Sequence, residues 1–290
     1  MRCYVCKNEA PSPKGYCSRC RPFFTHRSER MRRRAALIAA YDPAADGFRD
    51  HLSGVLLETR DHSDPFFLVF DHLIPVESSE LVASSALFNR MKTDMAPDEF
   101  RTAFRLLAAH YRGEPFDKGL IEFAYWKRLS PHPPRPAMRL YPEEVAYPRV
   151  DACVVCGSPP WRGSIYCVRC REFIFWRGYD RARRARAMRV AWDPGAGRFV
   201  CHYTGAAIED RDAASPWYLS FDHATPGDPD SIVVCAAWVN SMKNALSADE
   251  FRRVVIEYDR YLREGGEFDR DVVDFDYWRS AHMQHSRRPR

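Results

Sequence analysis

Residues 65–92, PFFLVFDHLIPVESSELVASSALFNRMK, recur without a gap as residues 216–243, PWYLSFDHATPGDPDSIVVCAAWVNSMK. In each stretch an apolar run ends at Asp-His, a loop and a second short apolar run follow, and Asn-x-x-Lys closes the pattern. Short runs of this composition predict strands. An Asn and a Lys at this spacing lie on one face of a helical turn. Each stretch therefore predicts a strand, a loop, a second strand and a helix.

The repeat extends over most of the 290-residue chain. Other segments present in both copies are residues 98–100 with 249–251, and residues 125–126 with 277–278. We expect one unit over residues 1–130 and a second copy over residues 150–282, each long enough to bury a core. The proline-rich stretch 131–149 is expected to be a linker, because it cannot form a regular helix. A basic tail, residues 283–290, ends the chain.

Eight of the ten cysteines form the pattern Cys-x2-Cys-x10-Cys-x2-Cys, once in each copy. They are Cys3, Cys6, Cys17, Cys20, Cys153, Cys156, Cys167 and Cys170. Each Cys-x2-Cys pair turns two thiolates toward one ion, and two pairs complete a tetrahedral site for which Zn²⁺ is the usual occupant, with iron as an alternative. We expect two closed, structural zinc sites. Cys201 and Cys235 have Asp50 and Ser84 at the equivalent positions, and we expect them to be packed thiols.

The chain carries a formal net charge of +5, and its hydrophobic fraction of 46% is typical of globular proteins. No apolar run approaches the ~20 residues that span a bilayer. The N-terminus lacks a signal-peptide core, so we expect a cytoplasmic protein without a membrane partner.

Arginines cluster after the second cysteine pair of each copy, at spacings that place them on one helix face. The positions concerned are Arg27, Arg30, Arg34, Arg177, Arg181 and Arg184. The planar guanidinium group matches phosphate oxygens, so we expect these six residues to contact nucleic acid. A solvated helix face is the alternative interpretation.

Phe100, Phe104 and Leu107 recur at helical spacing, and the second copy has its own apolar stripe in the equivalent segment. We expect both segments to be core helices, one beginning at Pro97 and the other at a capping box of Ser247 and Glu250. The aromatic pairs 125–126 and 277–278 are expected to close the core near the end of each unit. His51 and His202, which precede the two central stretches, are expected to be structural.

Asp-His, the loop and Asn-x-x-Lys, in this order, resemble the HNH endonucleases, whose fold is the ββα-metal or His-Me finger. The resemblance covers roughly residues 48–112 and 199–263, and the cysteine modules are similar to accessory zinc sites of that family. Asn-Arg-Met-Lys at residues 89–92 is particularly similar to the HNH domain of CRISPR RNA-guided nucleases. The implied fold is α+β: two tandem ββα units, each with a zinc module and flanking helices.

The resemblance implies a metal-dependent endonuclease or nickase that cuts DNA, most readily duplex DNA, with RNA not excluded. His72 and His223 would deprotonate water as general bases. Asp71 with Asn89, and Asp222 with Asn240, would hold Mg²⁺ or Mn²⁺, hard cations that prefer oxygen ligands. Lys92 and Lys243 would contact phosphate.

Many HNH proteins place an asparagine at the start of the second strand, where it orients the catalytic histidine. Glu80 and Ser231 occupy the matching positions here, and either is a candidate for that role. Two other functions therefore stay open. One is a zinc-dependent nucleic-acid-binding protein with degenerate HNH units. The other is a subunit of a larger nucleoprotein or defence assembly, active only with a protein partner or guide.

Overall fold

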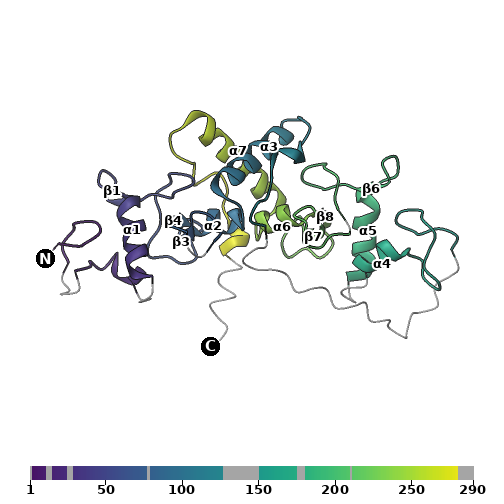
Figure 1. The fold of residues 1–290 in the computed structure, drawn as a ribbon, viewed down its shortest axis with the longest axis horizontal. Coiled ribbons are helices and arrows are strands. Elements are labelled where there is room, and N and C mark those ends of the chain that lie inside the picture. Colours follow the sequence, from purple (N-terminus) through teal and green to yellow (C-terminus); the bar gives the residue numbers. More distant parts are fainter. Residues whose placement is uncertain are drawn as a thin grey trace.

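The computed structural model describes residues 2–10, 15–24, 29–76, 79–126, 150–174, 180–209 and 211–279. The first copy forms η1 (Arg21–Phe24), α1 (Arg30–Ala40), β1 (Tyr41–Asp42), β2 (Gly47–Phe48), β3 (Leu68–His72), β4 (Leu81–Ser85), α2 (Ala86–Lys92), α3 (Pro97–Tyr111) and η2 (Lys118–Leu120). The second forms α4 (Val168–Ile174), α5 (Arg181–Ala191), β5 (Trp192–Asp193), β6 (Arg198–Phe199), β7 (Leu219–His223), β8 (Ile232–Ala236), α6 (Ala237–Lys243) and α7 (Ala248–Glu264). The α+β class and its repeated strand–loop–strand–helix order are as predicted (Figure 1).

Each copy contributes two antiparallel hairpins, and every sheet within the described residues has two strands. In the larger hairpins, β3 pairs with β4 and β7 with β8 over five residues each. Asp71 lies opposite Val82, and Asp222 lies opposite Val233. Asp-His thus forms the last two residues of the first strand, and α2 or α6 begins directly after the second. This connection brings the Asn-x-x-Lys helix back against the hairpin.

The predicted helix starts are confirmed. Pro97 is the first residue of α3. At the start of α7, the Ser247 hydroxyl accepts a hydrogen bond from the Glu250 amide (3.2 Å), and the Glu250 carboxylate accepts one from the Ser247 amide (2.7 Å). Such a reciprocal pair satisfies amide groups that a helix start leaves without partners.

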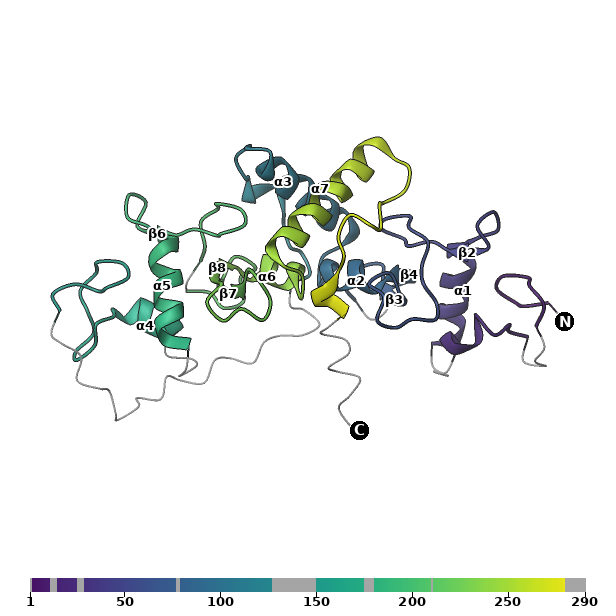
Figure 2. The same ribbon diagram turned by 180° about the vertical axis from the view of Figure 1, so that it is seen from behind.

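The apolar stripes of α3 and α7 pack against each other, so the long helices join the two copies (Figures 1 and 2). The Tyr258 ring lies 4.4 Å from the Phe104 ring and 5.1 Å from the Phe88 ring, centroid to centroid. Its hydroxyl donates to the Leu52 carbonyl of the other copy at 3.0 Å. Arg112 pairs with the buried Asp259 at 2.8 Å. One continuous core therefore runs through both central units.

After α3, the chain crosses to the second copy. Residues 113–126, which we call arm 1, place Phe116 and Phe123 against two tryptophans of the second unit. Phe116 lies 5.9 Å from Trp217, and Phe123 lies 5.4 Å from Trp238, between ring centroids. Lys118 lies over the Trp217 ring at 5.7 Å. Arm 1 thus covers the core of the unit to which it does not belong.

The segment after α7, residues 265–279 or arm 2, makes the reciprocal contacts on the first copy. Phe268 lies 5.1 Å from Phe88, and Phe275 lies 5.6 Å from Phe66, between ring centroids. Arg270 lies over Phe66 at 4.7 Å, which matches the place of Lys118 over Trp217. The copies therefore exchange equivalent arms, in the manner of an intramolecular domain swap.

This exchange differs from the expected role of the aromatic pairs. Trp278 is fully buried, but it lies beneath the Arg90 guanidinium of the first copy, with 4.8 Å between Cζ and the ring centroid. It closes the core of the opposite unit because α7 carries the chain across the contact between the copies. Both views show the end of arm 2 beside α2 (Figures 1 and 2).

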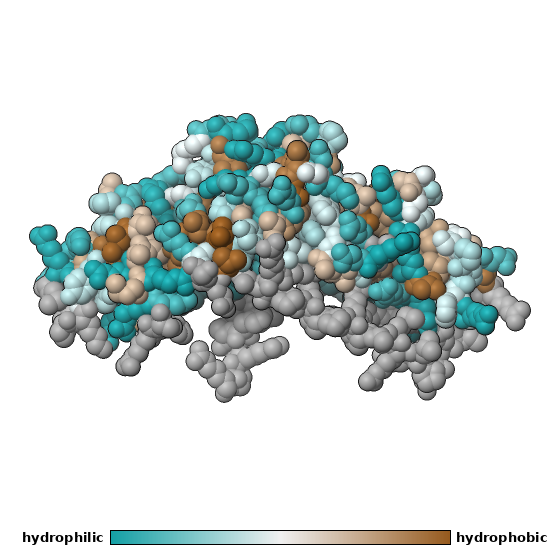
Figure 3. All heavy atoms as spheres, in the orientation of Figure 1, coloured by the Kyte–Doolittle hydropathy of each residue, from teal (hydrophilic) through white to brown (hydrophobic). Residues whose placement is uncertain are grey.

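The face seen in Figure 3 is mostly hydrophilic, with hydrophobic residues in small separate patches. Within the described residues, no helix has the length and apolar character needed to cross a membrane.

The exchange predicts that the copies stay together when the chain between them is cut. A protease site inserted into residues 131–149 of the full chain, then cleaved, should yield two fragments that co-elute from a size-exclusion column without denaturant. Cleaved Phe123→Ala protein should separate at a lower denaturant concentration, because Phe123 is buried and a buried Phe-to-Ala change costs about 3–5 kcal/mol. Independent elution of the fragments would contradict the exchanged core.

Candidate functional site

The two four-cysteine clusters are formed as predicted. In each, the four sulfur atoms lie within 4.8 Å of one another, and all eight residues are fully or largely buried. Cys6 Sγ lies 3.5 Å from Cys17 Sγ and 3.8 Å from Cys20 Sγ. Zn–S bonds of ~2.3 Å in a tetrahedron place sulfurs about 3.8 Å apart, whereas a disulfide needs about 2.05 Å. The spacing therefore fits two structural zinc sites.

The electrostatics of the clusters also call for a cation. Burial raises the pKa of Cys20 far above its usual value, and the thiol of Cys17 raises it further. Burial and the neighbouring Cys153 do the same to the pKa of Cys170. Four adjacent thiols therefore cannot all ionise without a positive charge among them, which a divalent ion supplies.

Cys201 and Cys235 are buried away from these clusters, as expected for packed thiols. In the first copy, the Asp50 carboxylate accepts hydrogen bonds from the Ser84 hydroxyl and the Ser85 amide, just before α2. Cys201 Sγ accepts from the Ala236 amide at the same place before α6. The two extra cysteines thus replace a polar pair that holds the start of a helix.

At the centre of each unit, a lysine from the helix is ion-paired with the hairpin aspartate. Lys92 Nζ lies 3.2 Å from Asp71 Oδ2, and Lys243 Nζ lies 3.2 Å from Asp222 Oδ2. Lys92 also donates to the Met95 carbonyl at 3.1 Å, and Lys243 donates to the Leu246 carbonyl. Burial raises the pKa of both aspartates, and the adjacent lysine opposes that rise. Each pair locks a hairpin to its helix.

The placement of these lysines bears on their predicted role. Lys92 is 1% exposed and Lys243 is 0% exposed. Neither ammonium group is accessible, so a direct contact with phosphate would require each lysine to leave its carboxylate. In the structure, both lysines position the aspartates.

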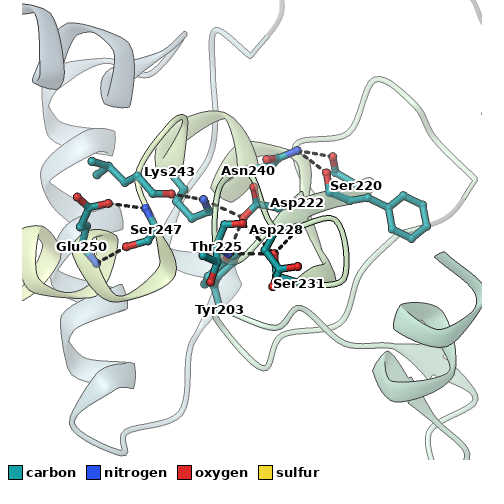
Figure 4. Close-up of polar contacts among 12 residues, drawn as sticks. Tyr203, Ser220, Asp222, Thr225, Asp228, Ser231, Asn240, Lys243, Ser247 and Glu250 are labelled. Carbon is teal, nitrogen blue, oxygen red and sulfur yellow. Dashed lines mark hydrogen bonds and ion pairs between the residues drawn. The ribbon is translucent and has the colours of Figure 1, made fainter. Parts of the chain in front are cut away.

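The predicted metal-binding asparagines lie on the same short helices as the lysines, three residues earlier. Asn240 donates Nδ2 to Ser220 Oγ (2.8 Å) and to the Phe221 carbonyl (3.1 Å), as Figure 4 shows. With these donor contacts made, its Oδ1 accepts no hydrogen bond from any described residue. Asn89 occupies the same position of α2 and is half-buried. The α6 helix thus turns the Asn240 amide toward Ser220 and Phe221 of β7, the strand that also carries Asp222.

His72 is held by a serine that the motif comparison did not identify. His72 Nδ1 lies 3.2 Å from Ser79 Oγ, and the Ser79 hydroxyl donates to the Ile74 carbonyl at 2.7 Å. The single hydroxyl proton is used by that second bond, so Nδ1–H donates to Oγ. Nε2 then carries the free lone pair, as a general base requires.

The residues expected to orient the histidines do not contact them. Glu80 lines a separate cavity of about 400 Å³ with His51. Ser231 Oγ is bonded within its own loop: it accepts from the Thr225 amide, and its one proton lies between the Thr225 and Asp228 carbonyls, at 2.9 and 2.8 Å. Side chains alternate across a strand, and this places Glu80 on the opposite face from Leu81, the partner of His72. The sequence offered no signal for Ser79, because Asp230 replaces it in the second copy.

His223 is exposed at the mouth of a cavity of about 340 Å³. Asp222, Lys243 and the turn that contains Pro226 and Gly227 also line this cavity. Among the described residues, none forms a hydrogen bond with the His223 ring. The cavity makes the second unit accessible to a ligand from solvent.

The predicted phosphate-binding arginines fall into different environments. Arg27 and Arg177 lie outside the described residues. Arg30 is exposed, whereas the Arg34 guanidinium lies 4.8 Å over the Tyr4 ring. Arg181 is half-buried.

Arg184 lies 4.6 Å over Phe221, and Arg33 lies 4.9 Å over Phe70, between Cζ and the ring centroid. These two equivalent residues join the helix after each zinc module to the residue before the Asp-His pair. In both copies, a stacked arginine therefore joins the helix that follows the zinc module to the hairpin.

No family model, curated protein or solved structure matches the chain. The two four-cysteine clusters and the repeated ββα-like elements stand on the structure itself. The likeness to HNH enzymes rests on the Asp-His and Asn-x-x-Lys residues and on their order.

Zinc content tests the metal centres. The full chain should bind two equivalents of zinc, and Cys20→Ser or Cys170→Ser should each remove about one, because a structural site needs all four thiolates. Cys235→Ser is the matched control and should retain two equivalents, measured by elemental analysis after gel filtration. Retention of both zinc ions in Cys20→Ser would refute the ligand assignment.

Lys243→Met should destabilise the fold by about 3–5 kcal/mol near pH 8, because it leaves Asp222 buried without its counter-charge. Without that lysine, the pKa of Asp222 in the folded state rises further above its unfolded value. The folded state then binds the extra proton, so stability lost at high pH returns as pH falls through the raised pKa. Urea unfolding at pH 5 should therefore show a smaller loss than at pH 8.

Lys118→Met is the control for this measurement. Lys118 pairs with Glu209 at 3.8 Å, and both side chains are more than two-fifths exposed. Exposed pairs contribute at most about 1 kcal/mol, so this variant should show a small loss at both pH values. Equal losses for the two variants would contradict a stabilising role of the buried pair.

Proposed function

We propose that the protein is a metal-dependent endonuclease or nickase of the HNH type, acting on DNA. The observation that carries the proposal is the arrangement around His72. Its Nδ1–H is bound by Ser79, its Nε2 is free to accept a proton, and Asp71 precedes it on the same strand. A histidine fixed in this tautomer beside a carboxylate suits the abstraction of a proton from water.

The oxygen donors fit a hard divalent cation. Asp222 and Asn240 offer a carboxylate oxygen and an amide oxygen from two adjacent elements, and Mg²⁺ is held in proteins by a few such oxygens with water completing the shell. Asp71 and Asn89 would do the same in the first copy. The bound cation would neutralise charge that develops on the phosphate. Burial raises the pKa of each aspartate, and the lysine beside it opposes that rise and holds the carboxylate in place.

The presence of two copies in one body favours duplex DNA as the substrate. The α3–α7 contact and the exchanged arms hold both units in one body, as subunits are held in a homodimer. Homodimeric enzymes use such paired sites on the two strands of a duplex. Exposed Arg30 and the arginine-rich tail would add contacts with phosphate that carry no sequence preference.

A plasmid assay tests the proposal. Zinc-loaded protein with Mg²⁺ or Mn²⁺ should nick supercoiled DNA, and the His72→Ala/His223→Ala double variant should be slower by about 10²–10⁴-fold, the usual contribution of a general base. His62→Ala is the matched control, since this exposed histidine packs on Phe67 outside the site. Nicking by the double variant at the wild-type rate would refute the proposed bases.

The same assay separates the alternatives. Salt-dependent DNA binding without cleavage under any metal would favour a nucleic-acid-binding protein with degenerate units. Cleavage that appears only when a protein partner or guide is added would favour a subunit of a larger assembly.

A further inference from the structure

The two histidines are held differently. His72 is bound through Nδ1 to Ser79 Oγ, and Arg32 of α1 donates to the Ser79 carbonyl. In the second copy Asp230 stands in place of Ser79, and its carboxylate pairs with Arg183 at 3.0 Å. The arginine contact is thus retained, but the hydroxyl that fixes the imidazole is lost. His223 is left exposed, and no hydrogen bond from the described residues fixes the orientation of its ring.

The two aspartates differ as well. Asp222 Oδ2 accepts a hydrogen bond of 2.5 Å from the Tyr203 hydroxyl in addition to its contact with Lys243 (Figure 4). Tyr203 is buried, with 4% of its surface exposed. The first copy has Leu52 at the equivalent position, so no hydroxyl approaches Asp71 from there.

A short bond from a phenol draws electron density from a carboxylate and uses one of its lone pairs. The carboxylate is then a weaker ligand for a cation, because the donor proton and the cation compete for the same negative charge. Hydrogen-bonding partners of metal ligands act on metal affinity at a scale of about 10–100-fold, and most of them strengthen binding by orienting the ligand. Here the sign is the reverse, because the phenol and the ammonium group both bind Oδ2 of Asp222 and compete with a cation for its charge. Lys92 and Lys243 act alike on the two aspartates, so they do not create this difference.

We infer that the two ββα sites are unequal: the first copy is the main cutting site, and Tyr203 lowers the cation affinity of the second. The inference rests on the proposed function and identifies Ser79 and Tyr203 as positioning residues. Under limiting cation, the protein nicks one strand through His72. At high cation concentration, the second site fills and the opposite strand is cut as well.

Cation binding is measured apart from cleavage. The His72→Ala/His223→Ala background keeps the aspartates and asparagines, so Mn²⁺ can be titrated into the zinc-loaded chain with a short duplex and followed by the EPR signal of free Mn²⁺. Two affinities should appear. Asp71→Asn should remove the tighter one, and Asp222→Asn the weaker one.

Tyr203→Phe in the same background should strengthen the weaker affinity by about tenfold, the lower end of the range for residues behind a metal ligand. Tyr261→Phe is the control and should leave both affinities unchanged. A single affinity for both sites, or no response to Tyr203→Phe, would overturn the inference while leaving the proposed function intact. No Mn²⁺ binding together with no nicking by wild type would overturn the proposed function itself.

Ser79 is tested through its effect on rate. In a His223→Ala chain, which retains only the first histidine, Ser79→Ala should lower the maximal nicking rate without changing the Mn²⁺ concentration for half-maximal rate. A general loss of structure would change both quantities. An unchanged rate would remove Ser79 from the inference.

Discussion

A two-stranded hairpin with one short helix cannot bury enough apolar surface to be stable alone. Every larger feature of this protein compensates for that deficit. On one side, each hairpin is joined to a four-cysteine module through an arginine stacked on its aromatic residue, Arg33 on Phe70 or Arg184 on Phe221. On the other side, it is covered by an arm from the opposite copy. The ββα unit therefore depends for its stability on contacts with the zinc module on one side and with the opposite copy on the other.

The buried lysines show how this support extends to the central aspartates. An aspartate within a packed hairpin would tend to be protonated, because burial raises its pKa. Lys92 and Lys243 supply the compensating charge from the following helix, and they also bind the carbonyl groups beyond its end. One side chain thus joins hairpin, helix and loop and opposes the rise in the carboxylate pKa that burial causes. Asn240, one helical turn earlier, binds the same hairpin through Ser220 and the Phe221 carbonyl.

The repeat, the cysteine spacing and the helix starts could be predicted because each depends on a local pattern or a short motif. The arm exchange could not, since Phe116 and Phe268 reveal only that they are apolar, and both copies offer similar aromatic surfaces to cover. The contacts of Ser79 and Tyr203 depend on which side chains the fold brings together. The difference between Tyr203 and Leu52 is visible in the sequence, yet only the structure shows that the hydroxyl reaches Asp222.

The exchanged arms determine the order in which the two units complete their cores during synthesis. A chain leaving the ribosome can form its first zinc module early, but the first hairpin waits for Phe268, Phe275 and Trp278, which are made only after the second unit. The second unit, by contrast, finds arm 1 already made. Domains commonly mature in the order in which they are translated. In this chain the first unit is the last to be completed, so a truncated product would carry an open core on the side of His72.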